Sequence, residues 1–413
     1  MAFQTGLSGL NASSKNLDVI GNNIANSNTT GFKNSRAEFS DLVASSIGVG
    51  GSNNAGLGVA IDTVAQQFTQ GNLTITGNSL DIAINGAGFF QLEMPDGATA
   101  YTRAGNFKMD NTGTIVTNGG ARVMGYPTDT AGVATSTTPG ALTLPTGAPI
   151  PAQATTTITA EFNLPAAATT VYNAATNTPP YTTYGTALTV FDSQGNAIPF
   201  SVNFTRAAGT AGPPALDNWQ VWDSNAPPTN PANTPLFTLS FDATGSLVAP
   251  VVSPTVTIAT PSPTTPDIVA TLDVSGVTQF ATAFGVTDLS QNGYTAGSFV
   301  GLSIAESGVI SARYSNGETQ AAGMLALADF RNVQGLAPIG GNNWVETYTS
   351  GQPLMGQPGL GKFGVTRAGA LEDSNVDLTG ELVNMMNAQR AYQANAQTIK
   401  TQDQVLQTLV NLR

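Results

Sequence analysis

The sequence predicts an α+β multidomain protein: paired N- and C-terminal helices forming a coiled-coil-like stalk, plus two mainly-β domains, the second inserted in the first. Heptad-spaced apolar residues at both ends predict the helices. Between them, strand-like alternation punctuated by glycine predicts β-structure, and 18 of the 24 prolines fall between residues 140 and 285. At 413 residues the chain is too long for one ordinary core, so we expect several domains.

The terminal segments carry their apolar residues at intervals that keep them on one helical face. Such a face needs another helix to cover it. We therefore predict a subunit interface on the stalk helices, formed at the N-terminal end by Phe3, Leu7, Leu10, Leu17 and Ile24, and at the C-terminal end by Leu378, Leu382, Met385, Tyr392, Ile399, Leu406 and Leu409.

Two arrangements of these helices are open. They can pair within one chain as a hairpin, or they can pack between chains. The polar face of the C-terminal segment carries Asn and Gln in place of the usual Glu–Lys pairs, which favours burial among other helices. Because isolated helices with so little charge support are marginal in water, we hypothesise that the ends are largely unfolded in the free monomer and fold on assembly.

The ends lead into connecting segments. We assign residues 1–30 and 372–413 to the helical stalk, and residues 31–70 and 351–371 to linkers. A Gly-, Ser- and Asn-rich stretch at 45–58 is typical of a flexible connection. Ser374 and Asp377 have the spacing of a capping box at the start of the C-terminal helix.

The β-rich middle divides by composition. We predict a first β-domain at 71–140 and 286–350, and a second, Pro- and Thr-rich domain at 141–285. In the second domain, residues 188–191 and 200–204 flank the turn 192–196 as a hairpin. The Asp-containing turns at 110–113, 192–196 and 242–245 resemble fragments of calcium loops but lack the downstream acidic ligands, which favours ordinary hairpin turns.

Composition excludes many functions. The net charge is −12, and only 10% of residues are charged. Because the basic residues form no cluster in the sequence, a nucleic-acid partner is not expected. The chain has no Cys and no His, which removes disulfides, thiol chemistry and the usual metal ligand and proton shuttle. An enzyme would have to use a carboxylate pair, yet the candidates Glu93, Asp96, Glu161, Glu306 and Glu318 sit in no motif. We predict a non-enzyme without cofactor or metal.

The sequence contains no apolar run long enough to span a bilayer, which needs about 18–20 residues. The N-terminal segment also lacks the basic start, apolar middle and small-residue cleavage site of a secretory signal. We therefore expect no membrane insertion. If the protein acts outside the cell, it must leave by a route that cleaves no signal peptide.

Read literally, the ends resemble the rod-and-hook branch of the bacterial flagellar axial proteins. At the N-terminal end the resemblance lies in the run at 6–33, GLSGLNASSKNLDVIGNNIANSNTTGFK, and at the C-terminal end in LEDSNVDLTGELVNMMNAQRAYQ at 371–393. The most specific motif positions are Asn22, Asn23, Asn26, Gly31, Phe32, Ser374, Asn375, Asp377, Gln389 and Arg390. Residues 76–90 and the run YTRAGNF at 101–107 are similar to the family's β-domain signature.

The resemblance implies a structural subunit of the flagellar hook. Length, the inserted domain and the closing run TIKTQDQVLQTLVNLR favour the hook over the shorter distal rod subunit or the hook–filament junction protein. The resemblance also implies that the chain forms a helical homo-oligomer. This assembly would be a curved, flexible tube that acts as a universal joint and transmits torque from the rod to the filament. Implied partners are the distal rod protein, the hook cap, the junction protein and the flagellar export apparatus. A secreted β-rich adhesin is the remaining alternative, but it leaves the paired heptads unexplained.

Overall fold

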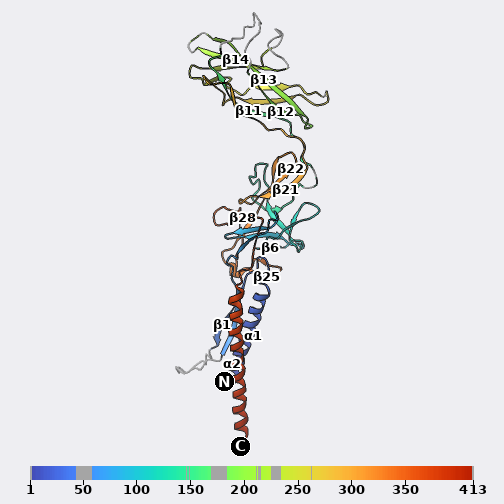
Figure 1. Ribbon diagram of the computed structural model, residues 1–413. Helices are drawn as coiled ribbons and strands as arrows, with labels where there is room; N and C mark the ends of the chain where they lie inside the picture. The colour runs from blue at the N-terminus through green and yellow to red at the C-terminus, as the bar shows by residue number, and fades with distance from the viewer. Residues whose placement is uncertain are drawn as a thin grey trace. The chain divides into compact units, whose positions relative to one another are not determined.

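The computed structural model describes residues 2–42, 58–145, 147, 149–168, 184–210, 212, 215–224, 234–261 and 263–411. The chain divides into two compact units (Figure 1). Unit 1 comprises residues 1–147, 301–313 and 319–413, and unit 2 comprises residues 148–300 and 314–318. The mostly-β multidomain architecture agrees with the sequence prediction.

Unit 1 contains the two helices, α1 (Ala2–Ala25) and α2 (Leu378–Asn411). They lie side by side and run in opposite directions, because Gly6 faces Ile399 whereas Gly9 faces Asn395 (Figure 1). A Cβ atom on Gly9 would lie 2.9 Å from the Asn395 amide nitrogen, so these glycines allow the helices to approach closely. The helices therefore pair within one chain. Among the described residues, no helix is long and apolar enough to cross a membrane.

The start of α2 differs from the predicted capping box. The backbone N–H of Thr379 donates to Oδ1 of Asp377 at 3.0 Å, whereas the Ser374 hydroxyl accepts from Val376 N–H at 3.3 Å. Asp377 is therefore the N-cap, and the prediction that Ser374 caps the helix is wrong. The reason is positional: α2 begins at Leu378, so Ser374 lies too far upstream to reach its first free N–H groups.

Between α1 and the sheet, two strands form within residues 31–70, which sequence analysis assigned to a connecting segment. They are β1 (Ser35–Leu42) and β2 (Gly58–Gln66), paired antiparallel from Ser35↔Gln66 to Leu42↔Gly58. Both strands contact α1, and the Ser8 hydroxyl accepts a hydrogen bond from Val59 N–H. Most of the predicted flexible stretch, residues 45–57, lies outside the described residues.

The body of unit 1 is a sheet of thirteen strands, in which eight form a continuous path in the order β21-β22-β23-β9-β5-β6-β26-β25. Its inner face is packed by a cluster that includes Phe90, Leu92, Phe107 and Leu325. The strands are β5 (Phe89–Glu93), β6 (Thr99–Thr102), β7 (Lys108–Met109), β8 (Ile115–Val116), β9 (Arg122–Tyr126), β10 (Gly140–Ala141), β21 (Phe299–Ile304), β22 (Val309–Tyr314), β23 (Thr319–Leu325), β24 (Leu327–Asp329), β25 (Ala337–Gly340), β26 (Asn343–Val345) and β27 (Leu354–Gly356). A 3-10 turn, η1 (Val333–Gly335), precedes β25.

Two short antiparallel pairs join segments from the two ends of the sequence. Strand β3 (Leu73–Ile75) pairs with β29 (Ala370–Glu372), and β4 (Ile82–Asn85) pairs with β28 (Val365–Ala368). The chain thus returns beside its own beginning before entering α2. This pairing places the start of the C-terminal motif run, residues 371–372, beside residues 73–74.

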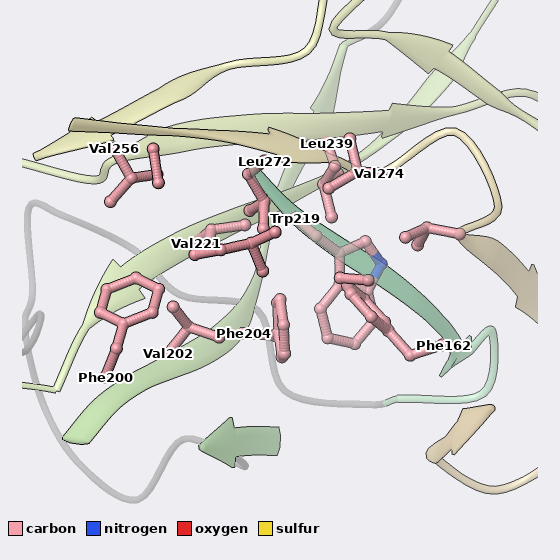
Figure 2. Packing of buried hydrophobic residues seen from close by; sticks show 14 of the residues in the cluster. Phe162, Phe200, Val202, Phe204, Trp219, Val221, Leu239, Val256, Leu272 and Val274 are labelled. Atoms are coloured by element: carbon pink, nitrogen blue, oxygen red, sulfur yellow. The ribbon is translucent and has the colours of Figure 1, made fainter. Parts of the chain in front are cut away.

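Unit 2 is a sandwich of two five-stranded sheets (Figure 2). Phe162 of β11 packs against Phe204 of β13, with their ring centroids 4.5 Å apart. One sheet contains β11 (Thr157–Pro165), β17 (Thr255–Ile258), β18 (Ile268–Asp273), β19 (Thr278–Phe280) and β20 (Gly285–Gln291); the other contains β12 (Tyr184–Phe191), β13 (Ala197–Thr210), β14 (Leu216–Asp223), β15 (Phe237–Phe241) and β16 (Leu247–Ala249). In β11 and β13 the buried side chains alternate, as the two-residue period of a strand requires.

The three Asp-containing turns are hairpin-type turns. In the turn between β12 and β13, the buried Asp192 carboxylate accepts hydrogen bonds from the N–H groups of Gln194 (2.9 Å) and Asn196 (2.8 Å). The Asn196 side-chain amide donates to its second oxygen at 2.9 Å. Asp110 and Asp242 accept backbone N–H groups with the same spacing. These carboxylates therefore satisfy the turn backbone.

We expect the Asp192 turn to make unit 2 sensitive to acid. Burial opposes the charged form, but the hydrogen bonds from Asn196, Gln194 and Gly195 outweigh it and lower the pKa of Asp192 below 3.8. A lowered folded-state pKa contributes stability above the unfolded value, and that stability is lost as pH falls through the folded value. Asp192→Asn should lower the free energy of unfolding at pH 7 and reduce its fall below pH ~4.

The measurement is urea unfolding followed by tryptophan fluorescence in a Trp344→Phe background. The remaining tryptophans, Trp219 and Trp222, both lie in β14, so the signal reports unit 2. Asp267→Asn serves as the control, because it makes the same substitution at an exposed side chain of unit 2. An identical pH dependence for Asp192→Asn and the parent would contradict the role given to the turn.

Candidate assembly site

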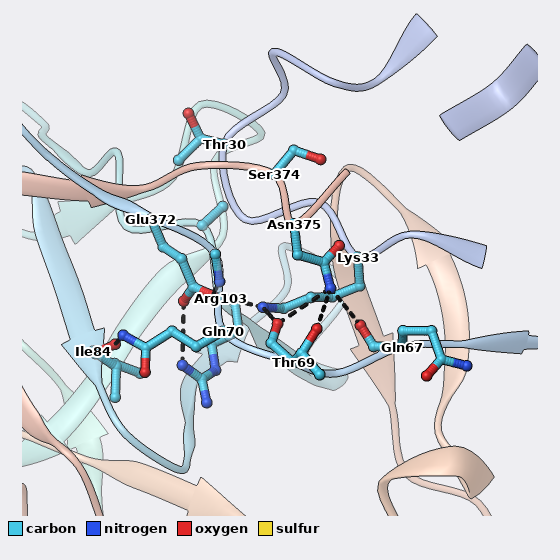
Figure 3. Close-up of polar contacts among 12 residues, drawn as sticks. Thr30, Lys33, Gln67, Thr69, Gln70, Ile84, Arg103, Glu372, Ser374 and Asn375 are labelled. Carbon is cyan, nitrogen blue, oxygen red and sulfur yellow. Dashed lines mark hydrogen bonds and ion pairs between the residues drawn. The ribbon is translucent and has the colours of Figure 1, made fainter. Parts of the chain in front are cut away.

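A buried cluster of three charged side chains joins the two ends of the chain to the sheet of unit 1 (Figure 3). Lys33 follows α1, Arg103 follows β6, and Glu372 ends β29. The Lys33 Nζ atom lies 2.5 Å from Oε1 of Glu372, and Nη1 of Arg103 lies 3.2 Å from Oε2. These side chains are 1%, 6% and 0% exposed, respectively, so the cluster is shielded from solvent.

Backbone groups add further hydrogen bonds to the cluster. Lys33 Nζ also donates to the Thr69 carbonyl at 2.8 Å, and Arg103 Nη2 donates to the Gly86 carbonyl at 2.8 Å. The Gly71 N–H donates to Oε1 of Glu372 at 3.0 Å. One carboxylate thus holds two cations and one loop together, with the Arg103 guanidinium 5.3 Å from the Phe89 ring centroid.

Burial and pairing act in opposite directions on these cations. Desolvation lowers the pKa of Lys33, while Glu372 raises it and Arg103 lowers it further. Desolvation likewise lowers the pKa of Arg103, against the attraction of Glu372 and Asp329. The cations depend on the one carboxylate for compensation, because removing one partner of a buried ion pair leaves an uncompensated charge.

Gly31 brings the N-terminal motif into contact with this cluster. Its N–H donates to the Glu372 carbonyl at 2.8 Å, and its φ of 70° lies in the left-handed region. A Cβ atom here would lie 2.6 Å from the Ala104 backbone nitrogen. The position therefore requires glycine for both conformation and space.

Asparagine side chains fix the backbone around the cluster. Asn375 accepts from Asn34 N–H at 2.7 Å through Oδ1, and its amide donates to the Gln67 carbonyl at 2.7 Å (Figure 3). The buried Asn23 bonds both backbone groups of Ser35, donating to the carbonyl at 2.7 Å and accepting from N–H at 2.9 Å. These amides thus satisfy backbone N–H and C=O groups near the cluster.

The other motif positions fall into two groups. Asn26 donates to the Asn22 carbonyl at 2.9 Å as α1 ends, and Phe32 and Ser374 are half-buried. In contrast, Gln389 and Arg390 are exposed on α2. The first group serves the junction between helices and sheet; the second is left without a role within the described chain.

The predicted stalk-interface residues are also divided between covered and exposed positions. The half-buried ones are Leu10, Leu17, Ile24, Met385 and Ile399. Those left exposed are Phe3, Leu7, Leu378, Leu382, Tyr392 and Leu406. The side chain of Leu409 lies outside the described residues. Pairing of α1 with α2 thus covers only part of the apolar surface of the helices.

Sequence reasoning missed the three charged residues of the junction as site residues. Lys33, Arg103 and Glu372 all stand inside the motif runs noted above, but no local spacing relates them, since Lys33 and Glu372 are 339 positions apart. The usable signal was their presence inside the motif runs themselves. Among the described residues, no group of three or more acidic side chains is placed to hold a metal ion.

Comparison with known families places this arrangement among flagellar proteins. The description "Flagella basal body rod protein" matches residues 3–33, and "Flagellar hook protein FlgE/F/G D1 domain" matches residues 83–171. "Flagellar basal body protein FlaE D2 domain" matches residues 163–294, and "Flagellar basal body rod FlgEFG protein C-terminal" matches residues 367–412.

The relatives that match over their full length and are reported below are flagellar hook proteins FlgE. The chain is 42% identical to the flagellar hook protein FlgE of Escherichia coli K12 and 40% identical to that of Salmonella typhimurium, each over the whole of both chains. It is 34% identical to the Treponema pallidum FlgE over 99% of this chain and 98% of the relative. The crystal structure of Helicobacter pylori FlgE2 shares the fold, with a TM-score of 0.54 over 72% of this chain and all of that chain, at 18% identity.

We expect Glu372→Gln to destabilise unit 1 severely. The amide keeps the shape but leaves Lys33 and Arg103 as buried, uncompensated cations, a loss of about 3–5 kcal/mol in the free energy of unfolding. Urea unfolding followed by circular dichroism at 222 nm measures it, because both helices lie in unit 1.

The matched control is Glu38→Gln, which breaks an ion pair with Arg36 of 2.6 Å in which both side chains are largely exposed. Solvent screening should hold its cost within ~1 kcal/mol. Equal losses for the two variants would show that the buried cluster does not stabilise the junction.

Proposed function

Since the chain belongs to the family of the flagellar hook protein FlgE, we propose that it works by assembling helically into a curved, flexible tube that links rod to filament and transmits torque. The chain is a structural subunit of the bacterial flagellar hook and not an enzyme. It resides in the flagellum and forms a homo-oligomer there.

The observation that carries the proposal is the surface left exposed on the helices. Leu378, Leu382 and Met386 follow each other at four-residue intervals along α2, and all three remain about half exposed. An apolar stripe at this spacing occupies one helical face, and burying it stabilises association. In a homo-oligomer the natural cover is a helix of a neighbouring copy, which would give the coiled-coil-like stalk.

The junction gives this stalk a mechanical role. A load on the helices must pass to the sheet through the backbone near Gly31 and Glu372, where a buried ion cluster and several amide bonds fix the geometry. Flexibility would then come from outside the junction rather than from the junction itself. This division suits a universal joint: stiff units connected by compliant links.

Partners, export and domain limits complete the proposal. The distal rod protein, hook cap protein, hook–filament junction protein and flagellar export apparatus are the partners that the family implies, and export would proceed without a cleaved signal peptide. We retain the division into stalk (1–30, 372–413), linkers (31–70, 351–371), first β-domain (71–140, 286–350) and inserted second β-domain (141–285). We also retain the twelve stalk residues as subunit-interface sites and the ten motif positions as the family motif.

Electron microscopy of basal bodies from a strain lacking this gene tests the assignment. Complete rods without hooks are the expected result. Truncated rods would instead place the subunit in the distal rod, and hooks that lack only the filament would place it at the junction. Normal hooks and filaments would refute the proposal altogether.

We expect Leu382→Gln to impair polymerisation without destabilising the monomer. The side chain is 47% exposed, so its replacement removes little intrachain packing, whereas burial in a neighbouring copy would be lost. Sedimentation of purified polymers should show a critical concentration raised ~10-fold, corresponding to about 1.4 kcal/mol. The unfolding midpoint should stay unchanged.

Val251→Gln is the control, since Val251 is 91% exposed in unit 2 and lies outside the helices. It should polymerise like the parent. If Leu382→Gln also polymerises normally, the exposed stripe on α2 is not a subunit contact.

A further inference from the structure

The sequence contains four Asn–Gly dipeptides, and all four lie within the described residues. An asparagine followed by glycine is open to self-modification, because the glycine nitrogen can attack the asparagine side-chain carbonyl carbon and glycine has no side chain to hinder the approach. The attack requires a glycine N–H that is free and an asparagine side chain that can turn toward it. Hydrogen bonds to these two groups therefore decide which dipeptide reacts. The dipeptides are Asn85–Gly86, Asn118–Gly119, Asn292–Gly293 and Asn316–Gly317.

The first dipeptide is held at both reacting groups. The Gly86 N–H donates to Oε1 of Gln70 at 3.0 Å, and Oδ1 of Asn85 accepts from the Gln70 amide at 3.4 Å. Strand β4 ends at Asn85 and pairs with β28, which also fixes the backbone at this position. Attack by Gly86 would require these contacts to break.

The Asn292 dipeptide of unit 2 is held by more hydrogen bonds. Oδ1 of Asn292 accepts from the N–H groups of Thr156 at 2.9 Å and Thr157 at 3.0 Å. The Asn292 amide donates to Oγ1 of Thr156 at 2.8 Å. The Gly293 N–H donates to Oε1 of Gln291 at 2.5 Å. Both the carbonyl and the attacking nitrogen are thus engaged.

The Asn316 dipeptide, also in unit 2, is held in the same way. The Asn316 amide donates to the Thr295 carbonyl at 2.6 Å, and its Oδ1 accepts from the Glu318 N–H at 3.1 Å. The Gly317 N–H donates to the Tyr314 carbonyl at 3.1 Å. Three of the four dipeptides therefore have both reacting groups in hydrogen bonds.

The remaining dipeptide has neither restraint. Asn118 and Gly119 are both exposed in the turn between β8 and β9, which the Gly120 N–H closes by donating to the Thr117 carbonyl at 3.0 Å. Among the described residues, the Asn118 side chain makes no hydrogen bond, and the Gly119 N–H donates to no acceptor. The side chain is free to rotate and the nitrogen is free to attack.

We propose that Asn118 is a site of spontaneous deamidation. The Gly119 nitrogen bonds to Cγ of Asn118, the Cγ–Nδ2 bond breaks, and ammonia leaves with the proton that the nitrogen gives up. The product is a five-membered succinimide. Water then opens one of its two imide C–N bonds and yields aspartate or isoaspartate, each with a new negative charge. This inference does not depend on the proposed hook assembly.

The new carboxylate would enter a groove that carries no charge. Asn118 lines a groove of about 240 Å³ in unit 1, and none of the described residues around it is charged. In the same groove the Asn342 amide donates to the Thr30 carbonyl at 2.8 Å, which joins the sheet to the N-terminal motif run. Deamidation thus alters the electrostatics of a surface that this motif shares.

Peptide mapping of the purified full-length chain tests the site. After incubation, trypsin releases Asn118 in the peptide 109–122 and Asn316 in the peptide 314–331, and mass spectrometry separates acid from amide. Asn118 should convert at least ~10-fold faster than the other three asparagines, equivalent to about 1.4 kcal/mol in the barrier, because their hydrogen bonds must break first. The rate should rise with pH, since the attacking nitrogen must lose its proton.

Two controls separate the effect of structure from that of sequence. In urea the hydrogen bonds are lost, so the four dipeptides should convert at similar rates. Gly119→Ala should slow conversion of Asn118, because a methyl group hinders the attack. A Cβ atom there would lie 3.9 Å from Oγ1 of Thr117, an ordinary contact, and the Gly119 φ is outside the left-handed region. The fold should therefore persist, which circular dichroism at 222 nm checks.

Several results would overturn the proposal. One is conversion of another Asn–Gly dipeptide as fast as Asn118 in the folded chain. A second is conversion of Asn118 only after unfolding, and a third is a preference for Asn118 that is as large in urea as in the folded chain. An unchanged rate in Gly119→Ala would exclude attack by the Gly119 nitrogen. None of these results bears on the hook assignment.

Discussion

The structure of unit 1 depends on one buried carboxylate. Glu372 draws Lys33 and Arg103 together and accepts the Gly71 N–H, so four segments meet at a single side chain. Burying three charges costs solvation energy that a well-packed apolar cluster would not. What the ionic arrangement adds is geometry: directional bonds fix how the backbone leaves α1 and enters α2, which apolar packing alone leaves adjustable. For a subunit that assembles with other copies of itself, that fixed exit is a useful property.

Sequence analysis predicted the helices and strands better than the long-range contacts that join them. Heptad spacing located both helices, and alternation located the β12–β13 hairpin, because local periodicity reports directly on which face is covered. The junction could not be predicted this way, since Lys33 and Glu372 are remote in sequence and meet only after the sheet has formed. The same limit explains the missed β1–β2 pair, whose partner strands are separated by a glycine-rich stretch typical of a linker.

The capping error has a related cause. Ser374 and Asp377 satisfy a spacing rule, but the rule assumes that the helix starts directly after the first residue of the motif. In this chain Asn375 bonds the backbone of residues 34, 67 and 69, residues 374–376 stay outside the helix, and the helix begins at Leu378. The long-range hydrogen bonds of Asn375 at the junction have thus overridden the local tendency of Ser374 to cap a helix. The motif that sequence reasoning attributed to helix capping serves mainly to attach the helix to the sheet.

The positions of the few charged residues suggest a mechanical reason for the charge-poor composition. Amides and half-exposed apolar groups dominate the helix surfaces, and both can form new contacts when a neighbour shifts by a few ångströms, because neither demands one partner at one distance. Ion pairs are less tolerant, and the buried one is confined to the junction, where no sliding is needed. A curved tube that rotates about its own bent axis must cyclically compress and extend each row of subunits. In the assembly proposed above, strong charges at the junction and amide or apolar contacts between copies would allow that motion without breaking the subunit.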